Sequence, residues 1–299
     1  MTTKAGLSIL IPVYNYDVRG LIQQLHEQLI QLTIPAEILC FDDASPDESC
    51  KDVNREIINL PHVRYNELPV NLGRAAIRNK LASEADFQKL LFIDCDSELV
   101  NDNFVKNYLT YSANYLALAG GTIYEETNNT PQYSLRWTYG RAREQKTAEE
   151  RNKTPYESLT INNFLIDKDI FLGIKLDEGI EGYGHEDTKF GYALHNSNIT
   201  LYHISNPVIH CGLESNEVFL KKTETAIKNF YKLSQQGYGK ETSLYKSFSL
   251  LNKYHLKKLF LFIYELVGNY IQKKLCSPSP SLLLFDLYKL KLLLLEDKK

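Results

Sequence analysis

The sequence lacks a basic excess, closely paired cysteines and long apolar runs, and each absence excludes a class of protein. Lysine and arginine number 34 against 37 aspartates and glutamates, which gives a net charge of −3, so a general nucleic-acid binder is not expected. The five cysteines form no CxxC pair, which excludes a zinc cage and a disulfide framework and indicates a reducing compartment. No apolar run reaches the roughly 18 residues of a membrane span.

The sequence does have enough apolar residues for a large core, because 43% of its 299 residues are hydrophobic. Its first apolar run, residues 7–13, is too short for a secretion signal and favours a buried strand. We therefore expect a cytoplasmic protein, with peripheral contact at a membrane as the alternative.

Short apolar runs alternate with helix-like stretches, a pattern typical of α/β proteins with a mostly parallel sheet flanked by helices. We expect strands at 7–13, 36–41, 63–65, 89–93, 115–124, 159–166 and 200–205. We expect helices at 18–32, 47–60, 73–84 and 185–196, with a short one from residue 167. The polar stretch 125–155 lies between these elements and is expected to form a functional loop or lid.

The last part of the chain differs in charge, since residues 241–299 contain ten lysines and five acidic residues. Its pattern predicts helices at 243–275 and 281–295, broken by Ser-Pro-Ser-Pro. We expect a domain over 1–215 and a helical C-terminal extension over 216–299. The basic amphipathic helices are typical of a peripheral membrane surface, but a helical subdomain packed on the first domain, or a homodimer interface, explains them equally well.

Carboxylates follow two of the expected strands: Asp42 and Asp43 after the second, Asp94 and Asp96 after the fourth. The carboxyl ends of parallel strands share one edge of a sheet, where ligands bind. Four carboxylates there repel one another unless a divalent cation, a ribose or a base lies among them. Asp94 and Asp96 are two residues apart, so in an extended chain both face one side, and hard oxygen ligands suit Mg²⁺ or Mn²⁺.

Each of these motifs also has a purely structural interpretation. Asp-x-Asp occurs in surface turns, and Asp42-Asp43 can form a turn before a helix that Ser45 or Asp47 caps. The arginines of the segment NLGRAAIRN, residues 71–79, lie at a predicted helix N-terminus and favour phosphate. The same arginines can instead pair with acidic neighbours.

The order of the segments ILIPVYN, FDDASPD, NLGRAAIRN and LLFIDCDSE resembles the family 2 glycosyltransferases, which have the GT-A fold and use nucleotide-sugar donors. A later segment, EGYGHEDTKFGYAL, is similar to the glycine-aromatic-glycine-x-Glu-Asp segment of galactosyl- and N-acetylgalactosaminyltransferases. The resemblance covers roughly residues 5–215. For the nucleoside, it implies that Asp42 or Asp43 binds the uracil ring and that Pro12 and Tyr14 line the pocket.

The resemblance also implies roles near the phosphates. Arg78 would approach the nucleotide, and Asp94 would contact the ribose. Asp96 would hold the Mn²⁺ or Mg²⁺ that bridges the donor diphosphate. His210 matches a metal-binding histidine of many GT-A enzymes, although a lone histidine is also commonly structural.

For catalysis, the resemblance implies that Asp187 is the base and that Glu186 binds donor or acceptor hydroxyls. Acidic residues at a helix N-terminus also have a purely structural explanation in the helix dipole. The implied activity is inverting, metal-dependent transfer of a hexose or N-acetylhexosamine, with Gal or GalNAc favoured. The donor would be a UDP-sugar and the acceptor a glycan or glycolipid hydroxyl, in polysaccharide or glycoconjugate assembly.

Two other functions are alternatives to this one. A sugar-nucleotidyltransferase needs a glycine-rich basic loop after the first strand, and residues 12–19 contain none. A non-catalytic nucleotide- or glycan-binding module is expected to lack the metal or base carboxylates, and both are present.

The chain departs from the family pattern at several positions. Ala44 replaces a loop glycine, which we expect to matter little. Tyr183 stands where relatives often have tryptophan, and His185 replaces a small residue and could tune Asp187 or only pack. The QxxRW element of processive synthases is absent after the base, since Arg136 and Trp137 precede it, which argues against a processive membrane synthase.

Overall fold

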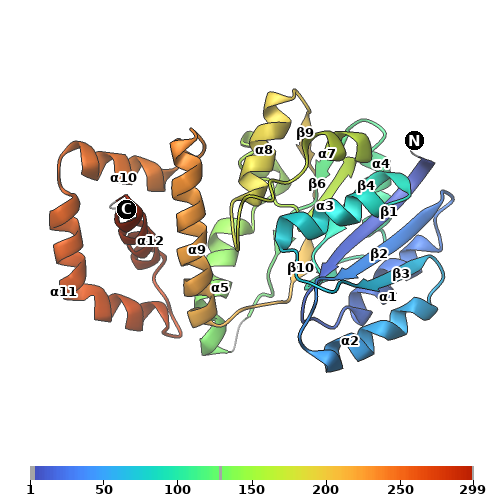
Figure 1. Cartoon of the computed structure of the whole chain (residues 1–299), viewed down its shortest axis with the longest axis horizontal. Helices are drawn as coiled ribbons and strands as arrows, with labels where there is room; N and C mark the ends of the chain where they lie inside the picture. The colour runs from blue at the N-terminus through green and yellow to red at the C-terminus, as the bar shows by residue number, and fades with distance from the viewer. Residues whose placement is uncertain (1–3, 128–129, 298–299) are drawn as a thin grey trace. The chain divides into compact units, whose positions relative to one another are not determined.

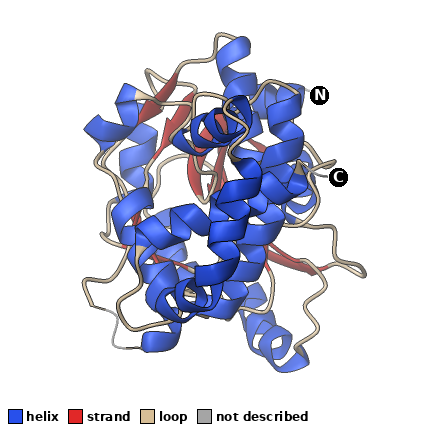
Figure 2. Cartoon of the chain, turned by 90° about the vertical axis from the view of Figure 1, so that its left-hand side faces the viewer, coloured by secondary structure: helices blue, strands red, loops and turns tan. Residues whose placement is uncertain are grey.

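The computed structural model describes residues 4–127 and 130–297, and the chain divides into two compact units (Figure 1). Unit 1 comprises Met1–Tyr124, Gln145–Gly179 and Glu186–Gly212. Unit 2 comprises Glu125–Glu144, Ile180–His185 and Leu213–Lys299. All the strands, red in Figure 2, belong to unit 1, and the described part of unit 2 is helical. The expected domains, 1–215 and 216–299, stay a prediction.

Unit 1 is built on a seven-stranded sheet with the order β3-β2-β1-β4-β8-β6-β9. Strand β8 runs antiparallel to both of its neighbours, and the other pairs are parallel. This confirms the α/β class and the mostly parallel sheet. The strands are β1 (Lys4–Val13), β2 (Ala36–Asp42), β3 (Val63–Glu67), β4 (Phe87–Ile93), β6 (Ala117–Ala119), β8 (Asn163–Asp167) and β9 (Leu201–His203).

Helices cover both faces of this sheet, and each face has its own apolar core. The cores explain why the first strands are almost continuously apolar, since strands buried on both faces need no alternation. On one face lie α1 (Arg19–Leu29), η1 (Arg55–Asn59) and α4 (Phe104–Tyr111), and on the other lie α3 (Arg74–Glu84), α7 (Lys168–Ile174) and α8 (Glu186–Asn196). Unit 1 also contains α2 (Glu48–Asn54) and α6 (Ala148–Lys153).

A second, three-stranded sheet has the order β5-β10-β7, with β5 (Ser97–Leu99), β10 (Val208–His210) and β7 (Thr122–Ile123). The prediction of one strand at 115–124 is therefore wrong, because β6 and β7 belong to different sheets. The break lies at Gly120 and Gly121. Gly121 has φ +89°, and a Cβ there would lie 2.3 Å from the Arg151 guanidinium, so only glycine allows this turn.

Asn163 fixes the chain where it passes from one sheet to the other. Its side-chain amide donates to the carbonyls of Gly121 (2.8 Å) and Asn206 (2.9 Å), and its Oδ1 accepts from the Tyr108 hydroxyl (2.6 Å). Asn163 is fully buried. The two carbonyls precede β7 and β10, so this network sets the position of the second sheet.

The polar stretch 125–155 is largely helical, so the expectation of an irregular loop is wrong. Within unit 2, Arg136 pairs with Glu144 at 3.0 Å, and the Trp137 indole donates to the Glu125 carbonyl. A role as a lid stays a prediction. The helices are η2 (Pro131–Tyr133), α5 (Ser134–Tyr139), the π-helix η3 (Gly140–Glu144) and α6.

The rest of unit 2 consists of α9 (Asn216–Gln235), α10 (Ser243–Lys253), α11 (Lys257–Leu275) and α12 (Leu282–Glu296). Helix α12 contacts the other three, and its Leu293 and Leu294 are fully buried, which confirms a helical subdomain. The predicted single helix 243–275 is wrong, because the chain turns at His255, which has φ +57°. No helix of the described residues has the length and apolar content needed to cross a bilayer.

Replacing Asn163 with Ala should lower the free energy of unfolding by about 1–3 kcal/mol, because the buried Asn206 carbonyl loses the amide that donates to it. The Gly121 carbonyl keeps its bond from the Val208 N–H, and the Tyr108 hydroxyl keeps its bond to the Asn163 carbonyl. Urea denaturation measures this change. Asn59→Ala is the control, since the exposed Asn59 side chain bonds only the Glu56 carbonyl. Equal losses for the two variants would contradict the role given to Asn163.

Candidate active site

The candidate site lies at the carboxyl ends of β1, β2 and β4. Strand β1 is paired with β2 on one side and with β4 on the other. Chain order therefore reverses at β1, which is the switch point where open α/β sheets bind ligands. Pro12 lies near the end of β1, and Tyr14 follows it with half of its surface exposed.

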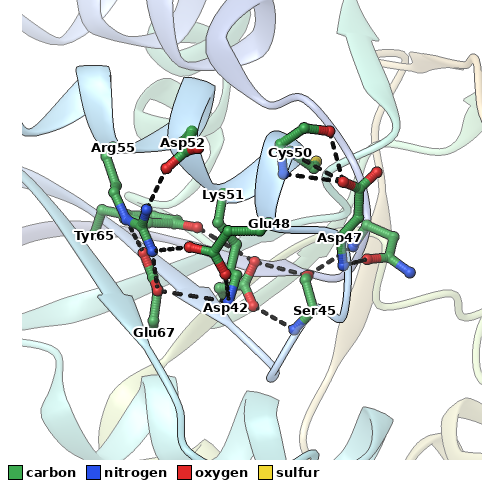
Figure 3. A network of polar contacts seen from close by, with 12 residues as sticks. Asp42, Ser45, Asp47, Glu48, Cys50, Lys51, Asp52, Arg55, Tyr65 and Glu67 are labelled. Atoms are coloured by element: carbon green, nitrogen blue, oxygen red, sulfur yellow. Dashed lines mark hydrogen bonds and ion pairs between the residues drawn. The ribbon is translucent and has the colours of Figure 1, made fainter.

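Asp42, at the end of β2, has both carboxylate oxygens bound within its own loop (Figure 3). The backbone N–H and the hydroxyl of Ser45 each donate to it at 2.7 Å, and the Tyr65 hydroxyl donates at 3.3 Å. Asp42 is fully buried. Burial, followed by the Asp42 charge, raises the pKa of Tyr65 above its usual range. This geometry matches the structural interpretation of Asp42 as a turn residue.

The loop that follows begins the next helix. Asp47 accepts from the backbone N–H groups of Ser49 and Cys50 and so caps α2, which confirms that part of the structural interpretation (Figure 3). Ala44 has φ +57°. A glycine, which the resemblance implies at this position, would adopt this conformation without the cost of about 1 kcal/mol that a side chain adds, so alanine has a conformational cost here.

Asp43 ties the end of β2 to the start of α3. Its two oxygens accept from the backbone N–H groups of Leu72 (2.7 Å) and Gly73 (3.0 Å). Burial raises the pKa of Asp43, and the two amide bonds oppose that rise. Asp43 and the helix that carries the two arginines are therefore held together.

Two arginines on successive turns of α3 bind carboxylates from separate parts of unit 1. Arg78, which is 4% exposed, pairs with Asp94 after β4. Arg74 Nε lies 2.6 Å from a carboxylate oxygen of Glu186 at the start of α8, and its Nη2 lies 4.0 Å from Asp94. The interpretation that the arginines pair with acidic neighbours is confirmed, and their contact with phosphate stays a prediction.

Glu186 and Asp187 are adjacent, yet their pKa values move in opposite directions. Burial acts to raise the pKa of Glu186, but the Arg74 charge and hydrogen bond outweigh it and hold this pKa below its usual range. Burial and the neighbouring Glu186 raise the pKa of Asp187 to about 7. Environments that move the pKa values of two neighbouring carboxyls apart in this way are typical of groups with different catalytic roles. For Asp94, burial is outweighed by Arg78 and Arg74, which lower its pKa.

Asp96 and His210 form the candidate metal centre. The antiparallel pairing of β5 with β10 places His210 opposite Ser97, so His210 Nδ1 lies 3.4 Å from Asp96 Oδ2. Gly212 allows the close approach, since a Cβ there would lie 2.3 Å from the same oxygen. The sequence analysis missed Gly212, whose signal is only its position two residues after His210.

One carboxylate oxygen and one imidazole nitrogen are donors that suit Mn²⁺. Among residues 4–127 and 130–297, no group of three or more His, Cys, Asp or Glu side chains could hold a metal ion. The pair therefore fits a cation that is completed by phosphate oxygens and water rather than a site made by protein alone.

The residues before α8 have unusual backbone. Gly184 and His185 have φ +96° and +74°, a conformation that glycine adopts freely and that is strained for histidine. Within unit 2, the His185 ring packs 5.2 Å from the Phe230 ring, and Lys222 lies 5.0 Å from the Tyr183 ring. The packing of His185 is thus observed, and its influence on Asp187 stays a prediction.

Comparison with known sequences points to one family. A family model described as glycosyl transferase family 2 matches residues 8–171. An uncharacterized glycosyltransferase of Haemophilus influenzae is 30% identical over 118 residues, 38% of this chain and 46% of that protein. A poly(ribitol-phosphate) beta-glucosyltransferase of Bacillus spizizenii is 33% identical over 106 residues, 34% of this chain and 16% of that enzyme. The matches thus span less than half the length of either relative.

Solved structures share the fold at low sequence identity. S. aureus TarS has a TM-score of 0.52 and 19% identity, over 73% of this chain and 38% of TarS. A shorter form, residues 1–349, in complex with UDP-GlcNAc, has a TM-score of 0.50 and 18% identity, over 75% and 66%. The mannosyltransferase PcManGT of Pyrobaculum calidifontis, in complex with GDP-Man and Mn²⁺, has a TM-score of 0.53 and 12% identity, over 77% and 64%.

Replacing Asp187 with Asn should stabilise the protein above pH 7. Because the pKa of Asp187 rises on folding to about 7, the stability from its neutral form is complete at about pH 4 and is lost as the pH rises through about 7. The melting temperature of the variant should exceed that of the parent at about pH 8, and the difference should shrink toward about pH 4. The exposed Asp102→Asn is the control, and equal pH profiles for Asp187→Asn and the parent would contradict the shift.

Proposed function

Since the chain belongs to glycosyl transferase family 2, we propose that it transfers a hexose or N-acetylhexosamine from a UDP-sugar to a glycan hydroxyl with inversion. The observation that carries this proposal is the Glu186-Asp187 pair. The pKa of Glu186 is lowered and that of Asp187 is raised, and the pair lies beside the arginines and Asp94 at the sheet edge. The names of similar proteins support a nucleotide-sugar donor, UDP-GlcNAc for TarS and GDP-Man for PcManGT. The preference for Gal or GalNAc rests on the segment EGYGHED alone.

Asp187 is the proposed general base. A carboxylate with a pKa of about 7 is a stronger proton acceptor than an ordinary aspartate, and near neutral pH a large fraction of it is ionised. It would take the proton of the acceptor hydroxyl as that oxygen bonds to the anomeric carbon and the bond to the diphosphate breaks. With one base opposite the leaving group, the displacement inverts the anomeric centre.

Glu186 is proposed to bind hydroxyl groups of the donor or acceptor. Its bond to Arg74 keeps it ionised, so it acts as a fixed acceptor and leaves the proton transfer to Asp187. Its negative charge also helps to raise the pKa of Asp187. Arg74 therefore influences the base through Glu186.

The leaving diphosphate needs positive charge. Arg78 and Arg74 supply it from α3, whose N-terminus also favours anions. Asp96 and His210 would hold the divalent cation, which when bound neutralises charge on the leaving group. Asp94 would contact the ribose while Arg78 holds its carboxylate in place.

For the base of the nucleotide, we favour Asp43 over Asp42. The Asp42 carboxylate is enclosed by Ser45 and Tyr65, whereas Asp43 binds only two backbone amides and keeps accepting capacity on both oxygens. Pro12 and the half-exposed Tyr14 would line the nucleoside pocket.

Asp187→Asn should lower kcat by about 100-fold or more, the scale of a general base, and leave UDP affinity unchanged. Transfer is measured with a panel of UDP-sugars and UDP binding by calorimetry. Asp102→Asn, outside the site, should keep the parent's turnover. Unchanged turnover in Asp187→Asn would remove this residue from the mechanism.

Mn²⁺ should strengthen UDP binding in the parent, and Asp96→Ala should reduce that gain by about tenfold or more, since a metal ligand is lost. Calorimetric titration of UDP with and without Mn²⁺ measures both effects, with Asp102→Ala as the matched control. A UDP affinity that does not depend on the metal in the parent would argue against the centre formed by Asp96 and His210.

A further inference from the structure

Six large side chains form an exposed line along α11, which we call the α11 stripe. They recur at spacings of three and four residues, so they share one face of the helix. Their exposed fractions run from 42% for Val267 to 71% for Leu266. The stripe consists of Leu259, Phe262, Ile263, Leu266, Val267 and Tyr270.

The α11 stripe is separate from the face by which this helix joins unit 2. Ile271 and Leu275 are 2% and 1% exposed and belong to a core with Phe285 of α12. Lys257 also turns inward, to Asp297. The helix therefore already has its packing partner, and the stripe is a second apolar face that the described residues of unit 2 leave uncovered.

Such a surface is not an ordinary feature of a protein in water. Single exposed apolar residues are common, but a contiguous apolar patch marks a site of contact with another molecule. The sequence pattern alone left open whether these residues pack inside the subdomain, and their exposure shows that they do not.

The charges around the α11 stripe are basic. Lys273 and Lys274 follow it and lie on the same side of the helix as the stripe, at 100° per residue, whereas Lys258 lies on the side of Glu265, seven residues before it. Lys258 and Lys273 are exposed. Glu265 is the single acidic residue of α11, and at this angular spacing it projects well away from the centre of the stripe.

We propose that the α11 stripe lies on an anionic lipid bilayer. Its apolar and aromatic side chains would enter the boundary between headgroups and acyl chains, and Lys273 and Lys274 at its C-terminal end would meet the lipid phosphates. This arrangement needs neither a spanning helix nor the glycosyltransferase activity, so it stands independently of the proposed function.

Charge favours lipid over a second copy of this chain. In a parallel pair of stripes, Lys273 and Lys274 of one copy would lie near the same lysines of the other. Such a pair brings like charges together at the rim, and Glu265 lies too far from the contact to compensate them. An anionic bilayer instead offers opposite charge along the whole length of the helix.

Sedimentation of the full chain with vesicles tests the proposal. The protein should bind vesicles of phosphatidylcholine with phosphatidylglycerol, bind phosphatidylcholine alone more weakly, and dissociate as salt rises. Leu266→Asp should weaken binding by about tenfold or more, because it removes buried apolar surface. Lys273→Gln and Lys274→Gln should each weaken it by about fivefold.

Ile58→Asp is the matched control, since Ile58 of unit 1 is 58% exposed but lies outside the stripe. It should bind vesicles as the parent does, and circular dichroism confirms that each variant is folded. Equal vesicle binding by the parent and Leu266→Asp would overturn the proposal. So would a dimer in sedimentation without lipid that Leu266→Asp converts to the 34.4 kDa monomer, because the stripe would then be an interface between copies.

Discussion

The pairing of two α3 arginines with carboxylates from β4 and α8 is the interaction on which the rest of the candidate site depends. Arg78 is almost fully buried, and a buried guanidinium is tolerated only with an ionised partner. Asp94 supplies that charge, and Arg74 joins Glu186 to the same helix. Without these cations, the carboxylates at this edge would repel one another.

The same interaction gives Glu186 and Asp187 different pKa values. Arg74 keeps Glu186 ionised, and an ionised neighbour together with burial makes Asp187 hard to ionise. Sequence order alone does not distinguish the two residues, since both are acidic and both begin α8. The distinction arises from which of them the arginine reaches.

The candidate metal pair, Asp96 and His210, depends on a different constraint, the small sheet of β5, β10 and β7. Asp96 and His210 are far apart in the chain and meet because β5 and β10 pair over three residues each. Asn163 fixes the crossing between the sheets, and Gly212 leaves room beside Asp96. The site is therefore assembled from two sheets, each held by its own buried polar contacts.

Much of this arrangement could be predicted from the sequence, because buried parallel strands are continuous apolar runs and their polar ends are easy to locate. The four N-terminal strands and the positions of Asp43, Asp94 and Asp96 at their ends follow from that pattern. The short strands β5 and β10 do not, since three residues carry no periodicity. The turn at His255 has no glycine or proline to mark it, and the left-handed Ala44 stands where sequence patterns expect glycine.

The helices in 125–155 could not be predicted from the sequence for a related reason. That stretch is polar and short in apolar repeats, so its order comes from specific contacts rather than from an amphipathic pattern. Residues 125–144 have contacts within unit 2, such as Arg136 with Glu144, and α6 in unit 1 begins with a capping box of Thr147 and Glu150. Tertiary contacts of this kind override local sequence signals.

The most direct measurement of the central claim is a crystal structure of the protein with UDP and Mn²⁺. The account predicts the cation bound by Asp96 and His210, the diphosphate beside the α3 arginines, and the Asp187 carboxylate facing the space where the sugar would lie. A nucleotide bound away from the β1, β2 and β4 ends, or an Asp187 carboxylate directed away from the diphosphate, would contradict it.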